Sequence, residues 1–149
     1  MELHLSGSNG INAPRQAIFD RLTNPDFLAR ALPDSEDVRV VDGSTLEAKV
    51  RVRVAVVSST LKVRMTVADK LPPEKATLQV EGSGSGSALR ITSTFTLTGD
   101  SPTQMNWTAD AEMTGVMAGL GSTLLKSFAT RKVDEIFSGI TKAIEQSSA

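Results

Sequence analysis

Residues 81–89 read EGSGSGSAL, and the structure of this stretch decides whether the chain folds as one unit or as two. Runs of glycine and serine are typical of flexible linkers, but they also occur in phosphate-binding loops and in sharp bends of a sheet. The flanking residues, ATLQVE before the run and LRITSTFTL after it, alternate apolar and polar side chains. This period of two predicts a β-strand on each side. Because a dinucleotide-binding loop opens a helix rather than a strand, the run is interpreted as the bend of a β-hairpin.

The same alternation continues along most of the chain and predicts an antiparallel sheet. It is found in residues 1–9, 45–56, 59–69, 76–81, 89–97 and 104–113. Each stretch has one apolar and one polar face, as expected for a sheet that is buried on one side and solvated on the other. The connections between the stretches are short and polar, which predicts a meander of hairpins.

Helical spacing is found in two regions. In the first, Pro14 suits the opening position of a helix, and Asn24-Pro25 ends that helix and begins another, which Pro33 ends. In the second, residues 115–146 carry apolar side chains every three or four positions, which predicts a long amphipathic helix.

These elements together predict an α+β fold. A curved antiparallel sheet of about seven strands would wrap around the long C-terminal helix, with two short helices after the first strand. Neither residues 1–81 nor residues 88–149 could cover their own part of the apolar sheet face. Residues 1–149 are therefore expected to form a single domain.

The composition limits the chemistry that this chain can perform. It has no cysteine and no tyrosine, and His4 is its only histidine. Disulfides, thiolate metal sites and thiol nucleophiles are excluded, and an enzyme would have to use carboxylates or lysines. The net charge of −1 gives no indication of a nucleic-acid partner. No signal peptide and no membrane-spanning stretch is recognisable, so a cytoplasmic protein is expected. Neither a metal nor a cofactor is expected.

The side chains on the inward sheet face suggest a cavity. Many are small, and the apolar strand positions include Ala48, Ala76, Ser93, Ala109 and Ala111. Protein interiors are densely filled, so small residues must be met by close approach of another element or by a ligand. One helix cannot cover the whole sheet, which favours a hydrophobic pocket between sheet and helix, although a fully packed core is an equally open alternative. No charged residue falls on this face, which favours a neutral lipophilic ligand over catalysis.

The candidate cavity residues are apolar side chains that would face the space between sheet and helix. They are Phe27, Leu32, Val52, Val54, Val63, Met65, Leu78, Ile91, Phe95, Trp107, Met113, Met117, Leu120, Leu124 and Phe128. Three glycines, Gly115, Gly119 and Gly121, precede the long helix and are interpreted as a hinge rather than a phosphate loop, because no lysine follows them. Met113, Met117 and Leu120 would line a gate there, with plain core packing as the competing interpretation.

A basic patch lies on the polar face of two neighbouring strands. Its members are Lys49, Arg51, Arg53, Lys62 and Arg64. A turn near Val57-Ser58 would place Arg53 opposite Lys62 and Arg51 opposite Arg64, and like charges directly opposite each other are destabilising. Either the register differs, or acidic neighbours intervene, or the patch meets an acidic partner or anionic lipid. A solvated face is the favoured interpretation.

Three stretches resemble the CoxG family, named for a component of carbon monoxide dehydrogenase, within the START-like, helix-grip superfamily. They are APRQAIFDRLTNPDFLARALPD at 13–34, LPPEKATLQVEGSGSGSA at 71–88 and GVMAGLGSTLLKSFATRKVDEIF at 115–137. The sequence departs from the family pattern at Asp34, where glycine usually follows the proline, which would alter the loop at the pocket mouth. It also ends at Ala149 without an extended tail or membrane anchor, which argues against stable membrane attachment.

The resemblance implies a non-enzymatic carrier of a neutral lipophile, quinone- or lipid-like. The ligand would be a hydrophobic small molecule, and the protein partner a molybdenum hydroxylase such as aerobic carbon monoxide dehydrogenase, with peripheral membrane contact. One alternative is an assembly or recruitment factor that acts by protein–protein contact. Another is a cyclase or dehydratase of the same superfamily, which would require Asp110 or Glu112 to turn inward.

Overall fold

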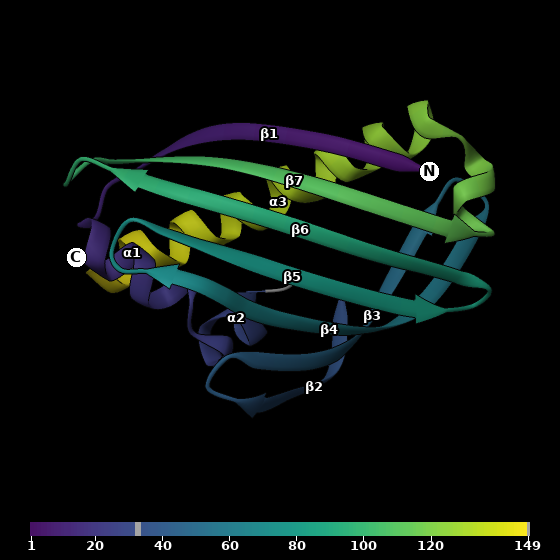
Figure 1. The fold of residues 1–149 in the computed structure, drawn as a ribbon, viewed down its shortest axis with the longest axis horizontal. Helices are drawn as coiled ribbons and strands as arrows, with labels where there is room; N and C mark the ends of the chain where they lie inside the picture. Colours follow the sequence, from purple (N-terminus) through teal and green to yellow (C-terminus); the bar gives the residue numbers. More distant parts are fainter. Residues whose placement is uncertain (32–33, 149) are drawn as a thin grey trace.

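The computed structural model of the chain describes residues 1–31 and 34–148. Its elements are, in order, β1 (Glu2–Ile11), α1 (Arg15–Leu22), α2 (Pro25–Ala31), β2 (Ser35–Asp42), β3 (Thr45–Val54), β4 (Val57–Leu71), β5 (Lys75–Gly84), β6 (Ser87–Thr98), β7 (Thr103–Gly115), the 3₁₀ helix η1 (Met117–Leu120) and α3 (Ser122–Ser148) (Figure 1). In the described part of the chain, seven strands form one antiparallel sheet, so the predicted α+β helix-grip fold is confirmed.

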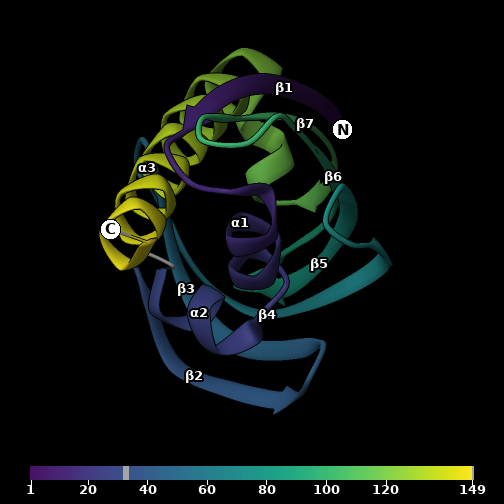
Figure 2. The same ribbon diagram turned by 90° about the vertical axis from the view of Figure 1, so that its left-hand side faces the viewer.

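The strand order explains how the sheet wraps around the helices. It is β1-β7-β6-β5-β4-β3-β2, so the first strand pairs with the last and the two helices after β1 carry the chain to the opposite edge. Figure 2 shows the sheet curving around α1, with α3 lying across the open side of the curve. The apolar face of the sheet therefore faces the helices, and the polar face is on the outside.

The glycine–serine run forms a tight hairpin between β5 and β6. Gly84 pairs with Ser87, and the two residues between them, Ser85 and Gly86, have φ angles of 51° and 78°. Positive φ at both central positions is the signature of a two-residue type I′ turn. At Gly84 a Cβ atom would lie 2.3 Å from the carbonyl oxygen of Thr60, so the backbones approach closely there. The hairpin interpretation is confirmed, because β5 and β6 pair directly across the run.

The β3–β4 hairpin turns two residues earlier than predicted. Ala55 and Val56 form the turn, with Ala55 at a φ of 53°. Val56, which the alternation placed on the inward face, is 95% exposed at the tip. The earlier turn shifts the register of the basic residues. The following predicted pairs are therefore wrong: Arg53 with Lys62, and Arg51 with Arg64.

Carboxylates separate most of the basic residues on this outer face. Glu47 lies opposite Arg64 and accepts hydrogen bonds from both Arg39 and Arg64. The hydrogen bond from Arg39 lowers the pKa of the Glu47 carboxyl, and the positive charges of both arginines lower it further. Two further ion pairs join β2 to β3: Arg51 with Glu36 at 2.7 Å, and Lys49 with Asp37 at 3.3 Å. Lys49 lies directly opposite Lys62. Acidic neighbours and a shifted register therefore both reduce the repulsion that the sequence alone implied.

The two short helices begin close to their predicted positions, whereas the long helix begins at Ser122 rather than at residue 115, where the predicted helical stretch starts. The side chain of Asn24 accepts a hydrogen bond from the backbone N–H of Asp26, which caps α2 at its start. At the other end of the chain, Gly121 has a φ of 92° and separates η1 from α3. Met117 and Leu120 therefore belong to η1 rather than to the long helix. None of the described helices is long and apolar enough to cross a membrane.

Candidate ligand-binding site

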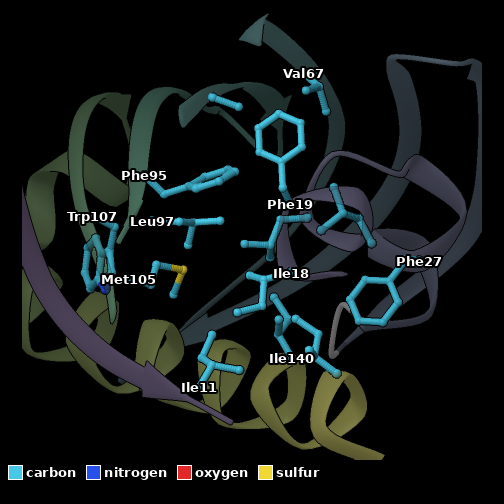
Figure 3. Close-up of a cluster of buried hydrophobic side chains, with 14 of the residues drawn as sticks. Ile11, Ile18, Phe19, Phe27, Val67, Phe95, Leu97, Met105, Trp107 and Ile140 are labelled. Atoms are coloured by element: carbon cyan, nitrogen blue, oxygen red, sulfur yellow. The ribbon is translucent and has the colours of Figure 1, made fainter. Parts of the chain in front are cut away.

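Two packed clusters of side chains close the ends of the space between sheet and α3. The α1 cluster joins α1, α2 and α3 to β1 and to the strands from β3 to β7 (Figure 3). Its buried members include Ile11, Ile18, Phe19, Phe95, Leu97, Met105, Trp107, Ile140 and Ile144. The η1 cluster lies at the opposite end, and its buried members are Leu3, Val54, Met117 and Leu125. In both clusters the apolar surface is removed from water, as in an ordinary core.

Between these clusters lies a central strip of the sheet in which many inward side chains are half-buried, whereas Leu3, Leu46 and Ala48 in the same cross-strand rows are buried. Cross-strand rows of the sheet define it, and its members are Leu5, Val63, Met65, Leu78, Val80, Leu89, Ile91, Ser93, Ala109, Ala111 and Met113. The row next to the strip, formed by Ala76, Phe95 and Trp107, is buried throughout. A packed core would be best buried at its centre, so this reversal indicates an incompletely filled interior.

The facing side of α3 repeats the same pattern. Leu125 near its start and Ile140 near its end are almost completely buried. The inward residues between them are half-buried, and they are Phe128, Lys132, Val133, Ile136 and Phe137. The accessible centres of the helix and of the sheet therefore face each other. These half-buried side chains pack against the two end clusters. We call the region between them, where we propose that a ligand is held, the central hollow.

The hollow is lined by small side chains on the sheet side. Ser93 and Ala109 are direct cross-strand partners, and Ala111 lies one inward position further along β7. At Gly82 a Cβ atom would come within 3.2–3.3 Å of Val63 and Leu89, so glycine allows these two side chains to approach each other. The apolar lining and the absence of charged groups from the described inward strand positions make the hollow suited to a neutral, lipophilic molecule.

The predicted cavity residues fall into different environments. Those that are half-buried on the inward side, around or next to the hollow, are Val52, Val63, Met65, Leu78, Ile91, Met113, Leu120 and Phe128. Those that pack into the buried end clusters are Val54, Phe95, Trp107 and Met117. Phe27 is buried on α2, and Leu32 lies outside the described residues.

One predicted cavity residue points the wrong way. Leu124 is 38% exposed, whereas its neighbour Leu125 takes the buried position against the η1 cluster. The physical reason is the helix start: because α3 begins at Ser122, after the break at Gly121, its inward stripe runs through Leu125 and Phe128. The sequence alone had spaced this stripe from Met117.

Several residues of the hollow were not among the predicted ones. On the sheet they are Leu5, Val80, Leu89, Ser93, Ala109 and Ala111, and on the helix Lys132, Val133, Ile136 and Phe137. The apolar strand residues share the alternation of those that were chosen, so that signal could have found them. Lys132 had no such signal, because it reads as one of the polar residues of an amphipathic helix.

Two recesses open on the surface near α3. The larger, of about 690 Å³, lies between α1, α2 and α3 and is lined by Asp20, Arg21, Asn24, Phe27, Arg30, Ala31, Gly139 and Ala143. The smaller, of about 350 Å³, adjoins the β3–β4 hairpin and α3 and is lined by Asp34, Arg51, Val52, Arg53, Ser58, Ser59, Thr60, Ser85 and Lys132.

An ion pair connects the loop after α2 to α3 at the smaller recess. The Nζ atom of Lys132 lies 2.9 Å from an oxygen of Asp34 and 3.1 Å from an oxygen of Glu135, and these hydrogen bonds raise the pKa of Lys132. Asp34 has a φ of 57°, a left-handed conformation that glycine adopts freely and aspartate tolerates. The departure from glycine at this position thus adds a carboxylate that binds α3.

The titratable groups of the strands lie away from the hollow. His4 and Asp110 contact each other at 2.5 Å on the exposed face of β1 and β7, and Glu112 is exposed as well. In the described residues no group of histidines and carboxylates has the arrangement needed to hold a metal ion. The inward turn of Asp110 or Glu112 that a cyclase-type site would require is not observed.

Solved structures share this fold. A conserved protein from Geobacillus kaustophilus is 23% identical over 99% of this chain and 98% of its own, with a TM-score of 0.88. A START superfamily protein from Mycobacterium smegmatis is 12% identical over 96% of this chain and 97% of its own (TM-score 0.73). The Zhui aromatase/cyclase from Streptomyces sp. R1128 is 13% identical over 98% of this chain and 95% of its own (TM-score 0.69). At these identities the likeness shows the START-like fold alone.

The sequence itself identifies the family. No curated protein matches it. The model of a family described as the carbon monoxide dehydrogenase subunit CoxG matches residues 7–145, which is most of the chain. The predicted resemblance is confirmed, and the chain belongs to the CoxG family of carbon monoxide dehydrogenase subunits.

Proposed function

We propose that this protein is a non-enzymatic carrier that holds a neutral, quinone- or lipid-like molecule in the central hollow. The observation that carries the proposal is the reversed burial pattern: the centre of the inward sheet face is more accessible than its ends. The candidate cavity residues of the sequence that adjoin the hollow would contact the ligand. Those in the end clusters would form its walls.

The chemistry of the lining supports a neutral ligand. The inward strand positions around the hollow carry aliphatic side chains, the thioethers of Met65 and Met113 and the hydroxyl of Ser93. An ionised group buried against such a surface loses its hydration without a compensating partner, which is strongly unfavourable. Apolar parts of a ligand instead gain about 25 cal/mol for each Å² removed from water.

A carrier is favoured over a catalyst because no acid–base pair faces the hollow among the described strand residues. His4, Asp110 and Glu112 lie on the outer face. A cyclase-type enzyme of this fold is the second candidate, favoured only by the structural likeness to an aromatase/cyclase. Cyclisation or aromatisation of a substrate by the purified protein would support that candidate.

The family name supports a partner. A molybdenum hydroxylase of the carbon monoxide dehydrogenase type is the proposed recipient of the protein or of its ligand. An assembly factor acting by protein–protein contact alone is the alternative. The two are separated by a variant whose hollow is filled by a larger side chain. If this variant still co-purifies with the enzyme and the enzyme remains active, the assembly factor is favoured. If the complex forms but the enzyme loses its function, the carrier is favoured.

Contact with a membrane is proposed at the end that holds η1 and the β3–β4 hairpin (Figure 1). Three apolar side chains are exposed there: Val56 at the hairpin tip, Val116 before η1 and Leu124 on α3. Residues 53–62 and 115–133 contain five cations, Arg53, Lys62, Lys126, Arg131 and Lys132, and no carboxylate. Exposed apolar tips surrounded by cations suit an anionic lipid surface.

The membrane contact is tested by flotation with vesicles of phosphatidylcholine, with and without phosphatidylglycerol. Val56→Asp is expected to reduce binding to the anionic vesicles. The control is Leu71→Asp, which changes an equally apolar, 62% exposed residue of another hairpin. Equal binding by both variants would contradict the assignment of this end.

The carrier function is tested by native mass spectrometry and solvent extraction of the purified protein. A bound hydrophobic molecule, at one copy per chain, is the expected result. Finding no bound molecule after expression and after incubation with quinones and lipids would count decisively against a carrier.

A further inference from the structure

Ser59 is a buried polar residue that the fold does not use. It lies on the inward face of β4, directly opposite Val52 of β3, and its side chain is 5% exposed. Among the described residues its Oγ atom has no hydrogen-bond partner. Buried hydroxyls are nearly always partnered, as at Ser87, whose Oγ accepts a hydrogen bond from the backbone N–H of Met117 at 3.0 Å. The unpartnered hydroxyl of Ser59 therefore needs an explanation.

Ser59 lines the recess of about 350 Å³ beside the β3–β4 hairpin. This recess is rich in hydrogen-bond donors: Lys132 and the hydroxyls of Thr60 and Ser85 line it as well. The carboxylate in its lining, Asp34, already accepts a hydrogen bond from Lys132. A molecule that enters the recess thus meets mainly groups that donate.

Lys132 has a donor to spare. Its ammonium group carries three N–H bonds, and the described carboxylates of Asp34 and Glu135 account for two of them. The same lysine belongs to the half-buried middle part of α3, between Phe128 and Ile136, which faces the central hollow. The recess therefore adjoins the hollow along α3, on the side of the η1 cluster.

We propose that Ser59 and Lys132 bind the polar end of the carried lipophile. The inference rests on the proposed carrier function and specifies the ligand: a neutral amphiphile whose polar end bears a hydrogen-bond-accepting oxygen, as in a quinone carbonyl. Rotation of Ser59 about χ1 moves its hydroxyl toward the recess, and the spare N–H of Lys132 provides a second donor. The apolar part of the ligand lies in the central hollow.

The test compares three probes by isothermal titration calorimetry. They are 2-farnesyl-1,4-naphthoquinone, its oxygen-free analogue 2-farnesylnaphthalene, and dodecyl phosphate. Ser59→Ala is expected to weaken binding of an oxygen-bearing probe about two- to tenfold, the usual effect of one lost hydrogen bond, and to leave the hydrocarbon unchanged. A carbonyl head predicts tight binding of the quinone, whereas tight binding of dodecyl phosphate that Lys132→Met weakens would contradict a neutral ligand.

A stability measurement separates a ligand-binding hydroxyl from a structural one. Without ligand, Ser59→Ala is expected to keep or raise the Tm, because it removes a buried group without a partner. The control Ser87→Ala is expected to lower the Tm, because it leaves the N–H of Met117 unpaired. A Tm of Ser59→Ala lowered as far as that of Ser87→Ala would overturn the assignment.

The outcomes also separate this inference from the proposed function. If no probe binds the wild-type protein, the carrier function is contradicted, and the inference falls with it. If the probes bind and Ser59→Ala binds every one as tightly as the wild type, only the inference is overturned.

Discussion

Filling the central hollow should stabilise the protein, and this prediction distinguishes a hollow from a packed core. Ala109 of β7 lies between Leu5 and Ser93 in the central strip and is half-buried. Ala109→Leu adds about three methylene-sized groups, and each stabilises by about 0.8 kcal/mol when it is buried without strain. Because some of the new surface stays accessible, a gain of about 1–2 kcal/mol in the free energy of unfolding is expected.

A matched alanine on the same face provides the control. Ala76 of β5 lies opposite Phe95 in the buried row next to the strip, and it is 0% exposed. Extra methylene groups in a well-packed region force neighbouring side chains out of place, so Ala76→Leu is expected to destabilise by about 1–3 kcal/mol. The two substitutions are chemically identical. Their effects on the free energy of unfolding are expected to have opposite signs, because the space around the two alanines differs.

The assay is equilibrium unfolding in urea, followed by circular dichroism and by the fluorescence of Trp107. A higher midpoint at an unchanged m-value reports greater stability of the native state. The filled variant should also lose binding of a farnesyl naphthoquinone. If Ala109→Leu destabilises the protein as much as Ala76→Leu does, the centre of the sheet is already packed and the reasoning is refuted.

Two further predictions concern the walls of the site and the sheet edge. At Gly7 a Cβ atom would lie 2.6 Å from the ring of Trp107, whereas at Gly10 it would meet nothing within 4 Å. Gly7→Ala should therefore destabilise the protein by about 1–3 kcal/mol, and Gly10→Ala should not. Equal unfolding midpoints of the two variants in urea would contradict this. The hydrogen bonds from the backbone and side chain of Arg15 hold the pKa of Asp100 below its usual 3.8. The pair therefore stabilises the protein above pH 3.8, and this contribution is lost as the pH falls through the lower pKa that Asp100 has in the folded protein. The difference in Tm between the wild type and Asp100→Asn should therefore shrink on acidification, and a constant difference would contradict the assignment.

The elements that follow from local pattern were predictable from the sequence. Alternation predicted the strands other than β2, whose side chains are mostly exposed. The glycine at position 84 explains why the turn between β5 and β6 is so tight. The proline at position 25 and the asparagine before it separated the two short helices. In each case residues close in the chain determine the structure, so one stretch of sequence carries the whole signal.

The β3–β4 turn was not predictable in this way. Its two residues, Ala55 and Val56, include no glycine, asparagine or proline, although Ala55 adopts a positive φ. The turn position follows from the pairing of β3 with β4 over its full length, which a local pattern does not contain. The inward stripe of α3 was misplaced for a related reason: its spacing was counted from Met117, and only the fold shows that Met117 belongs to the separate helix η1.

The site depends on relations between distant residues. The ion pair of Asp34 with Lys132 joins positions 98 apart in the chain. The half-buried middle parts of α3 and of the sheet lie between the two end clusters, an arrangement that no local pattern shows. Composition therefore left a pocket and a packed core equally open. The orphaned hydroxyl of Ser59 is visible only once the partners of every neighbouring residue are known.

The most direct test of the central hollow uses Trp107, which is the only tryptophan of the chain. It belongs to the α1 cluster, which forms one wall of the hollow. Its ring stacks on Phe137 of α3 with the centroids 5.1 Å apart, and Phe137 lines the hollow. Titration with 2-farnesyl-1,4-naphthoquinone should quench its fluorescence in a saturable manner, with one ligand per chain, and Ala109→Leu should abolish the saturable part. Quenching that rises linearly without saturation, or that is equal in the filled variant, would contradict a lipophile held between the sheet and α3.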